Sequence, residues 1–338
     1  MNSSRCLKKQ ARGRAIQRRN LKQQREKKRR GKSGGFNRPG QVPALIADKL
    51  PVLEFPETLS FEEKNQETRL FFHKLDEMIR EHKHGLMIKH AGLQNLSPAA
   101  ALVLIAEMYR LHREFPKHPK HCHLPEDSQV FDLLGHLGYF NYFPVSRWSS
   151  TNNDLSRFYL LHRRGERVDP GAVKALLIHF EDEQILNIPE RQALYAALVE
   201  YMQNVVDHAY PDSSKYCQWW LIGYRDSITH EISFCFYDQG VGIPETIRAR
   251  LQGKILYLSR SDSELVRKAV ESSNDLRTGD KNRGQGLPTL KRFVDSAGNT
   301  SLEIDSAATR CTFNPTQTTN SDTGIRFRGT LISWGLTR

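Results

Sequence analysis

The sequence has few cysteines, and no two of them lie close together. The five cysteines among 338 residues are Cys6, Cys122, Cys217, Cys235 and Cys311. Without a CxxC pair, this spacing argues against a disulfide framework and against a zinc ribbon, so we interpret them as reduced thiols. The segment HPKHCH at 118–123 gathers histidines around Cys122, but consecutive residues of an extended segment point to opposite faces. We therefore predict a polar loop and a short strand there instead of a metal site.

Long apolar runs are missing as well. No segment approaches the roughly 18 residues that cross a membrane as a helix, and the N-terminus lacks the apolar stretch of a secretory signal. We therefore expect a cytoplasmic protein without a membrane partner. The hydrophobic content of 38% over 338 residues is still sufficient for the cores of two domains of ordinary size.

Acidic residues are scarce at the N-terminus, where the charge is strongly one-sided. Residues 1–33 hold 14 Lys or Arg and a single acid, Glu26, whereas the rest of the chain is nearly neutral. A segment with so few large apolar residues cannot bury a core, so we predict a disordered tail or a helix that forms on a partner. Its charge suits salt-sensitive, sequence-independent binding to RNA, DNA or an anionic surface. A solvated tail without a dedicated partner is the alternative.

Two folded domains are predicted after this tail. GKSGGFNRPGQVP at 31–43 is a Gly- and Pro-rich linker, so residues 1–43 form a tail and linker that precede the first domain, residues 44–150. The elements expected in that domain are helices at 60–82, 97–115 and 127–143 and strands at 85–91 and 121–124. Ser97 suits the N-cap of the second helix and Pro98 its first position. The alternation of strands and helices predicts a small α/β layer.

The first domain resembles a STAS domain, the small module of anti-sigma-factor antagonists. The resemblance lies in the placement of the helices and in a serine at the start of the helix that follows a central strand. In that family the serine lies in an Asp-Ser type turn and can be phosphorylated by a partner kinase. Here the surrounding sequence is NLSPAA, without the Asp and Gly of the family. We therefore expect Ser97 to act as an N-cap. We still expect the domain to bind a protein partner.

The second domain, residues 151–338, contains the motifs that carry chemistry. Runs at 216–225 and 231–240 are rich in aromatic and β-branched residues around a short polar interruption, which predicts a β-hairpin. Upstream, EYMQNVVDHAY places Glu200, Asn204 and His208 at intervals of four, which puts them along one stripe of a helix. A solvated helix face is the ordinary interpretation of such a stripe.

Two glycine motifs follow in this domain. They are DQGVGIP at 238–244, where Asp238 ends a strand, and RGQGLP at 283–288, which opens onto a helix. Their glycines, which allow backbone paths that other residues resist, are Gly240, Gly242, Gly284 and Gly286. At a helix start, backbone N–H groups and the helix dipole favour phosphate oxygens, and Arg283 adds side-chain charge.

Three motifs together resemble the N, G1 and G2 boxes of the GHKL ATPases. In chain order they are the ExxxN helix, the strand that ends in DxGxG, and the GxG turn that leads into a helix. The GHKL superfamily includes DNA gyrase, the Hsp-type chaperone, the mismatch-repair ATPases and the histidine kinases. FRGTLISWGL at 327–336 resembles the terminal strand of bacterial members. The resemblance covers roughly residues 170–338 and implies an α/β (α+β) fold: a two-layer α/β sandwich with a mixed, mainly antiparallel sheet.

The resemblance also implies a role for each matching residue. Asn204 corresponds to the Mg²⁺ ligand, and Glu200 to the general base that activates the attacking nucleophile. Asp238 corresponds to the aspartate that accepts a hydrogen bond from the adenine amino group. The other matches contact ATP: Gly240 and Gly242 make room for it, Gly284 and Gly286 bind its phosphates with Arg283, and Thr330 supports the adenine. His208 has no counterpart, and the segment between Gly242 and Gly284 would be the ATP lid.

The kind of GHKL protein follows from what surrounds the motifs. No helical hairpin with an acceptor histidine precedes them, as in histidine kinases, and the chain is short for a gyrase, chaperone or mismatch-repair protein. It most resembles bacterial ATPases of the anti-sigma type, which transfer phosphate to a Ser or Thr of a protein partner. We therefore expect a Mg²⁺-dependent ATP-binding enzyme, an ATPase or a protein kinase, that couples nucleotide state to partner binding.

A second class of function stays open. In it, the protein is a nucleic-acid-associated interaction protein that uses residues 1–33, and ATP serves only as a conformational ligand. Dimerisation is common in the GHKL superfamily, so a homodimer also stays open.

Overall fold

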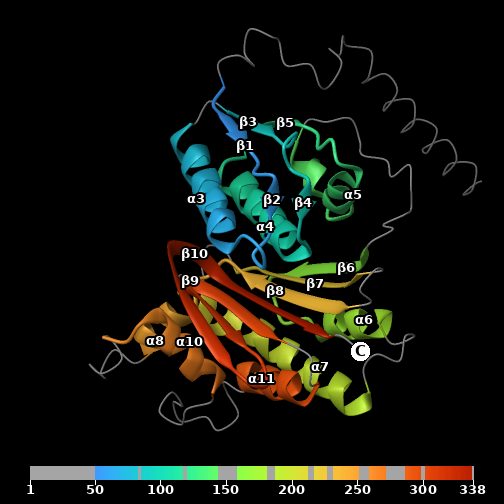
Figure 1. Cartoon of the computed structure of the whole chain (residues 1–338), viewed down its shortest axis with the longest axis vertical. Coiled ribbons are helices and arrows are strands. Elements are labelled where there is room, and N and C mark those ends of the chain that lie inside the picture. The colour runs from blue at the N-terminus through green and yellow to red at the C-terminus, as the bar shows by residue number, and fades with distance from the viewer. Residues whose placement is uncertain are drawn as a thin grey trace, which may run out of the picture. The chain divides into compact units, whose positions relative to one another are not determined.

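Two main β-sheets, each with helices packed on it, form the described part of the protein (Figure 1). The computed structural model describes residues 50–82, 85–116, 120–143, 158–180, 187–211, 217–226, 231–250, 259–271, 286–297 and 301–336. The predicted tail and linker, residues 1–43, lie outside this part. Among the described helices, none is long and apolar enough to cross a membrane.

The N-terminal sheet is small and parallel. Its strands, in sheet order, are β1 (Val52–Glu54), β3 (Leu86–Lys89) and β5 (Lys120–His123), and a separate parallel pair consists of β2 (Thr58–Leu59) and β4 (Asn95–Leu96). The helices of this half are α3 (Asn65–Glu81), α4 (Pro98–Glu114) and α5 (Ser128–His136). The predicted order of strands and helices between residues 60 and 136 is confirmed.

Two helix ends in this half show how local chemistry sets the boundaries. Ser97 is the N-cap of α4, because its Oγ accepts the N–H of Ala100 at 3.2 Å, as predicted. The helix predicted over 127–143 is instead interrupted after His136. Gly138 has a left-handed φ of 78° and precedes a 3₁₀-helix (Tyr139–Tyr142), because a residue in that conformation cannot continue an α-helix.

The C-terminal sheet is larger and antiparallel in all of its described ladders. Its strands, in sheet order, are β6 (Phe158–Gly165), β7 (Trp219–Asp226), β8 (Ile232–Asp238), β10 (Thr318–Leu336) and β9 (Leu302–Phe313). The predicted hairpin is therefore confirmed as β7 and β8. The C-terminal sheet was expected to be mixed, but none of the ladders described within this sheet is parallel.

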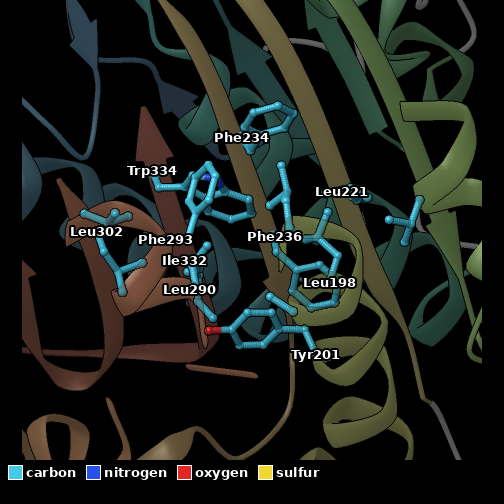
Figure 2. Close-up of a cluster of buried hydrophobic side chains, with 14 of the residues drawn as sticks. Leu198, Tyr201, Leu221, Phe234, Phe236, Leu290, Phe293, Leu302, Ile332 and Trp334 are labelled. Atoms are coloured by element: carbon cyan, nitrogen blue, oxygen red, sulfur yellow. The ribbon is translucent and has the colours of Figure 1, made fainter. Parts of the chain in front are cut away.

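In the described part of the chain, five α-helices accompany this sheet: α6 (Pro170–His179), α7 (Ile188–Asn204), α8 (Ile243–Arg250), α10 (Asp262–Val270) and α11 (Gly286–Ala297). Figure 2 shows the core between the sheet and α7 and α11, in which Phe234 and Phe236 of β8 meet Leu198, Tyr201 and Phe293. Each fully buried Phe or Leu contributes about 1.5–3 kcal/mol relative to an exposed side chain.

The opposite face of the C-terminal sheet is buried too. Trp220 of β7 packs on Tyr109 of α4, with ring centroids 6.1 Å apart, and Phe327 of β10 packs on Phe61, with ring centroids 5.3 Å apart. All seven residues of β8 are buried as a result, which explains why its sequence, ISFCFYD, shows no polar alternation.

The two halves therefore meet over a buried interface, and Leu50–Phe143 with Arg147–Arg338 belongs to one compact unit. The coarse fold class predicted from the sequence, α/β of the α+β type, is confirmed. The boundary between domains at residues 150 and 151 stays a prediction.

Candidate functional site

Helix α7 carries the first two predicted site residues, Glu200 and Asn204. The helix begins at a capping box: Asn187 Oδ1 accepts the N–H of Glu190 at 2.9 Å, and Glu190 Oε2 accepts the N–H of Asn187 at 2.8 Å. Glu200 and Asn204 lie one turn apart near the other end of α7, and both are half-buried. The helix and the placement of this pair agree with the sequence prediction.

The chain does not continue as an α-helix beyond Asn204. Val205–Ala209 forms a π-helical turn, which is wider than an α-helical turn because its hydrogen bonds run from residue i to i+5. His208 lies within this π-helical turn, so the third residue of the predicted stripe falls in an irregular part of the helix, and its place on the stripe stays a prediction. Such π-turns are frequent at functional sites.

The N-terminus of α11 lies against Glu200. A Cβ placed on Gly286 would be 3.3 Å from Glu200 Cβ and 3.4 Å from Glu200 Cδ, so a larger residue here would press on that side chain. The N–H groups of the first helical turn, which have no partner within the helix, and the positive end of the helix dipole therefore begin beside Glu200. Arg283 and Gly284, the other predicted residues of this motif, lie outside the described residues.

Asp238 ends β8 and is deeply buried. Within the sheet it is paired with Trp219 of β7 and Thr330 of β10. Its Oδ1 accepts the N–H of Gly240 at 2.8 Å, and its side chain is 7% exposed. Burial raises the pKa of Asp238 to about 7, and the hydrogen bond from Gly240 opposes that rise.

The loop after Asp238 is bonded to the π-turn after Asn204. The N–H of Val241 donates to the carbonyl oxygen of Ala209 at 2.9 Å, and a Cβ on Gly240 would lie 2.4 Å from that same oxygen. Tyr210 adds a second link, because its hydroxyl accepts the N–H of Gln239 at 2.9 Å. The structure thus brings the end of the α7 segment and the end of β8 together.

A bulged part of the β9–β10 ladder approaches the other side of Asp238. Gly329 has φ 76°, and a Cβ placed on it would lie 1.8 Å from the Asp238 carbonyl oxygen. Ser306 Oγ accepts the N–H of Ile243 at 3.0 Å and lies 3.2 Å from Thr330 Oγ1. It also faces Gly242, since a Cβ on Gly242 would be 2.9 Å from Ser306 Oγ. Ser306 therefore lies between the predicted residues Gly242 and Thr330 and contacts both.

Ser306, Tyr210 and Gln239 were not predicted from the sequence. Ser306 gave no clear signal, because the strand sequence around it, LEIDSAAT, also contains the polar residues Glu303, Asp305 and Thr309. The Tyr210 hydroxyl and the Gln239 side chain gave no signal in the sequence, since their partners are distant along the chain.

Metal ligands were predicted only at Asn204. Among the described residues, His, Cys, Asp and Glu side chains do not gather in groups of three that could hold a metal ion. A Mg²⁺ site of the predicted kind does not need such a group, because Mg²⁺ is commonly held by one or two protein ligands, substrate phosphates and water.

A separate cleft of about 310 Å³ lies between the two halves, and no residue of the predicted site lines it. Its charged lining residues are Glu62, Glu63, Glu231 and Glu303. Four carboxylates oppose the binding of a triphosphate, so charge favours the site at Asp238 and Glu200 over this cleft for a nucleotide.

The candidate site thus offers a buried hydrogen-bond acceptor at Asp238 and a helix N-terminus with a carboxylate at the pair Gly286 and Glu200. The first suits an amino group, and the second suits an anionic group whose reaction needs a base. No protein-family model matches the sequence, and a search of curated proteins finds no match, so the interpretation of this site rests on its geometry.

Proposed function

We propose that residues 151–338 form a GHKL-type ATP-binding domain that hydrolyses ATP or transfers its γ-phosphate to a Ser or Thr of a protein. The observation that carries the proposal is the meeting of four separate motifs: Gly286 contacts Glu200, and the Asp238 loop contacts the π-turn after Asn204 and the Gly329–Thr330 step. A purely structural role for these glycines and for Asp238 does not require the motifs to converge.

Each end of the nucleotide has its own residues in this proposal. Asp238 accepts a hydrogen bond from the adenine amino group, and Thr330 supports the base. Gly240 and Gly242 keep the adenine side of the site open. Gly286 at the start of α11 binds the phosphates together with Gly284 and Arg283.

Glu200 is the proposed general base. It takes the proton from a water or hydroxyl oxygen as that oxygen attacks the γ-phosphorus, and the bond from phosphorus to the β-phosphate oxygen breaks to release ADP. Asn204 would hold Mg²⁺ through its amide oxygen, and the ion would supply positive charge beside the phosphates. The helix N-terminus at Gly286 places backbone N–H groups on the same side as the base.

The N-terminal half is proposed as a STAS-like partner-binding module. Its parallel sheet β1-β3-β5 with three helices is consistent with such a module. Ser97 is engaged as the N-cap of α4, which favours a binding role over a role as phosphoacceptor.

Binding and turnover of Mg²⁺-ATP test the proposal, with the label of γ-³²P followed into both solution and protein. Glu200→Gln is expected to bind ATP and to lose turnover by about 10²-fold or more, whereas Asn204→Ala is expected to weaken Mg²⁺-dependent binding. Gln203→Ala is the control, because Gln203 is exposed on the same helix. Label in phosphate indicates an ATPase, and label in protein indicates a kinase. A wild-type protein that binds no nucleotide would contradict the proposal.

The second candidate function depends on the 14 basic residues of positions 1–33. In it the protein associates with nucleic acid and ATP is a conformational ligand only. Deletion of residues 1–33 distinguishes the two, because this function requires nucleic-acid binding that is lost with the tail and weakens steeply with salt. The ATPase or kinase proposal requires unchanged turnover in the deletion variant.

A further inference from the structure

A single buried carboxylate on α4 contacts the residues on both sides of Asp238. Glu107 is 4% exposed, and its Oε1 accepts a hydrogen bond from Gln239 Nε2 at 2.8 Å. The hydroxyl of Tyr237 lies 3.2 Å from the same oxygen. Tyr237 precedes Asp238 and Gln239 follows it, so Glu107 holds the strand end at two points around the proposed adenine-binding residue.

Glu107 is itself fixed by a network of charges between α3 and α4. Its Oε2 accepts from Arg110 Nη2 at 2.6 Å, and the same guanidinium donates to Asp76 of α3. Arg328 of β10 reaches Asp76 at 3.6 Å, and the Arg328 carbonyl oxygen lies 3.1 Å from the Tyr237 hydroxyl. The network therefore also touches the residue before Gly329.

The strand end has little room to shift on its own. On the β10 side, Gly329 approaches so closely that a Cβ would overlap the Asp238 carbonyl oxygen. On the α4 side, the contacts to Glu107 are buried, where hydrogen bonds to a charged group are stronger than at the surface. A displacement of α4 therefore displaces the backbone that carries the Asp238 carboxylate.

We propose that Glu107 is a positioning residue: through Gln239 and Tyr237 it sets the place of Asp238, and it thereby couples α4 to nucleotide affinity and base choice. This inference rests on the proposed function, because it assigns α4 a role at the same site. Coupling of this kind is reciprocal, so nucleotide binding must also stabilise the position of α4.

The test compares the affinities for ATP and GTP, since GTP has a carbonyl group where ATP has the amino group that Asp238 accepts. Gln239→Met removes the hydrogen bond to Glu107 with little change in volume, and Tyr237→Phe removes only the hydroxyl. In both variants we expect the ratio of ATP to GTP affinity to fall, by about fivefold or more for Gln239→Met. Arg113→Gln is the control, because Arg113 also lies on α4 and pairs at 3.4 Å with Glu166, the residue after β6.

A merely structural role for Glu107 predicts a different result, in which ATP and GTP affinities fall by the same factor. An unchanged ratio of ATP to GTP affinity in both variants therefore overturns the inference. The proposed function stays intact in that case, provided that the wild type binds ATP. Wild-type protein that binds ATP and GTP equally also overturns the inference, and wild-type protein that binds neither overturns the proposed function as well. Hydrogen exchange provides the reciprocal measurement: in the wild type, ATP is expected to slow exchange in the α4 turn around Glu107, and no change there contradicts the coupling.

Discussion

At the scale of single residues, Asp238 is a buried carboxylate whose surroundings do not favour stability of the folded protein. Burial raises the pKa of Asp238 to about 7. The Asp238 carboxylate accepts a hydrogen bond from the backbone N–H of Gly240. A carboxylate in such surroundings destabilises the folded state once it is ionised. Asparagine has nearly the same shape and keeps the acceptor oxygen for Gly240. Recognition of an amino group by a negative acceptor gives a reason for an aspartate at this position.

We therefore predict that Asp238→Asn stabilises the folded protein at pH 8 and weakens ATP binding at least tenfold. The folded pKa lies above the ordinary value, so wild-type stability decreases as the pH rises from about 4 to about 7, and asparagine does not titrate. The gain in unfolding free energy is expected to be about 1–4 kcal/mol at pH 8, since one pKa unit corresponds to about 1.4 kcal/mol. It should shrink toward zero near pH 4, as measured by urea unfolding across this pH range.

Asp322→Asn is the matched control for this prediction. Asp322 Oδ1 accepts the N–H of Gly324 at 3.0 Å in the same local geometry, but the residue is exposed. Its substitution should leave stability unchanged within about 0.5 kcal/mol. If Asp238→Asn were equally destabilising at pH 5 and pH 8, the raised pKa would be wrong and Asp238 would serve only the turn.

At the scale of elements, β10 shapes the site through one residue in a conformation that L side chains rarely adopt. Gly329 combines φ 76° with contact to the Asp238 carbonyl oxygen, whereas Gly324, on the same strand, has φ 64° and open space around it. The pair therefore separates the effect of the backbone conformation from the effect of the close approach.

We predict that Gly324→Ala lowers the free energy of unfolding by about 1–2 kcal/mol, the ordinary penalty for a left-handed conformation. Gly329→Ala should lower it by more than about 4 kcal/mol, because the added Cβ also forces β10 away from β8. Chemical denaturation of both variants provides the comparison. If the two variants lose the same unfolding free energy, then β10 shifts away from β8 at little cost and does not define the site.

Which elements could be predicted from the sequence depended on the range of the interactions that form them. The start of α4 and the β7–β8 hairpin were predicted correctly, since capping and hairpin signals lie within a few residues of each other. The π-turn after Asn204 and the role of Ser306 were not, because both depend on contacts with segments far away in the chain. Asp238 and Gly286 were identified by motif, but their neighbours became known only from the packing.

At the scale of the whole molecule, the C-terminal sheet depends on the N-terminal half for one of its faces. Arg69 of α3 has its guanidinium fully buried and donates to Asp305 Oδ1 at 2.7 Å and to the carbonyl oxygens of Ala307 and Thr309 at 2.8 Å each. Removal of either partner of a buried ion pair of this kind strongly lowers the stability of the folded protein, because the other charge stays buried. The same interface covers Trp220 and Tyr237, which are both 0% exposed.

We predict that residues 151–338 alone do not fold cooperatively, whereas residues 44–338 do. Without α3 and α4, the shorter fragment exposes Trp220, Tyr237 and Phe327, which creates an apolar patch, and removes Arg69 from Asp305. Of its two ion pairs with described residues, Asp305 then keeps only the one with Arg310, at 3.0 Å. Near-UV circular dichroism, dye binding and urea unfolding of the two fragments measure the difference. A sharp transition and ATP binding in the shorter fragment would contradict this dependence and would establish the boundary at residue 150 as a true domain border. Loss of both only in the shorter fragment would mean that the proposed ATP site and the N-terminal half fold as one unit, so that the proposed coupling through Glu107 acts within a single cooperative structure.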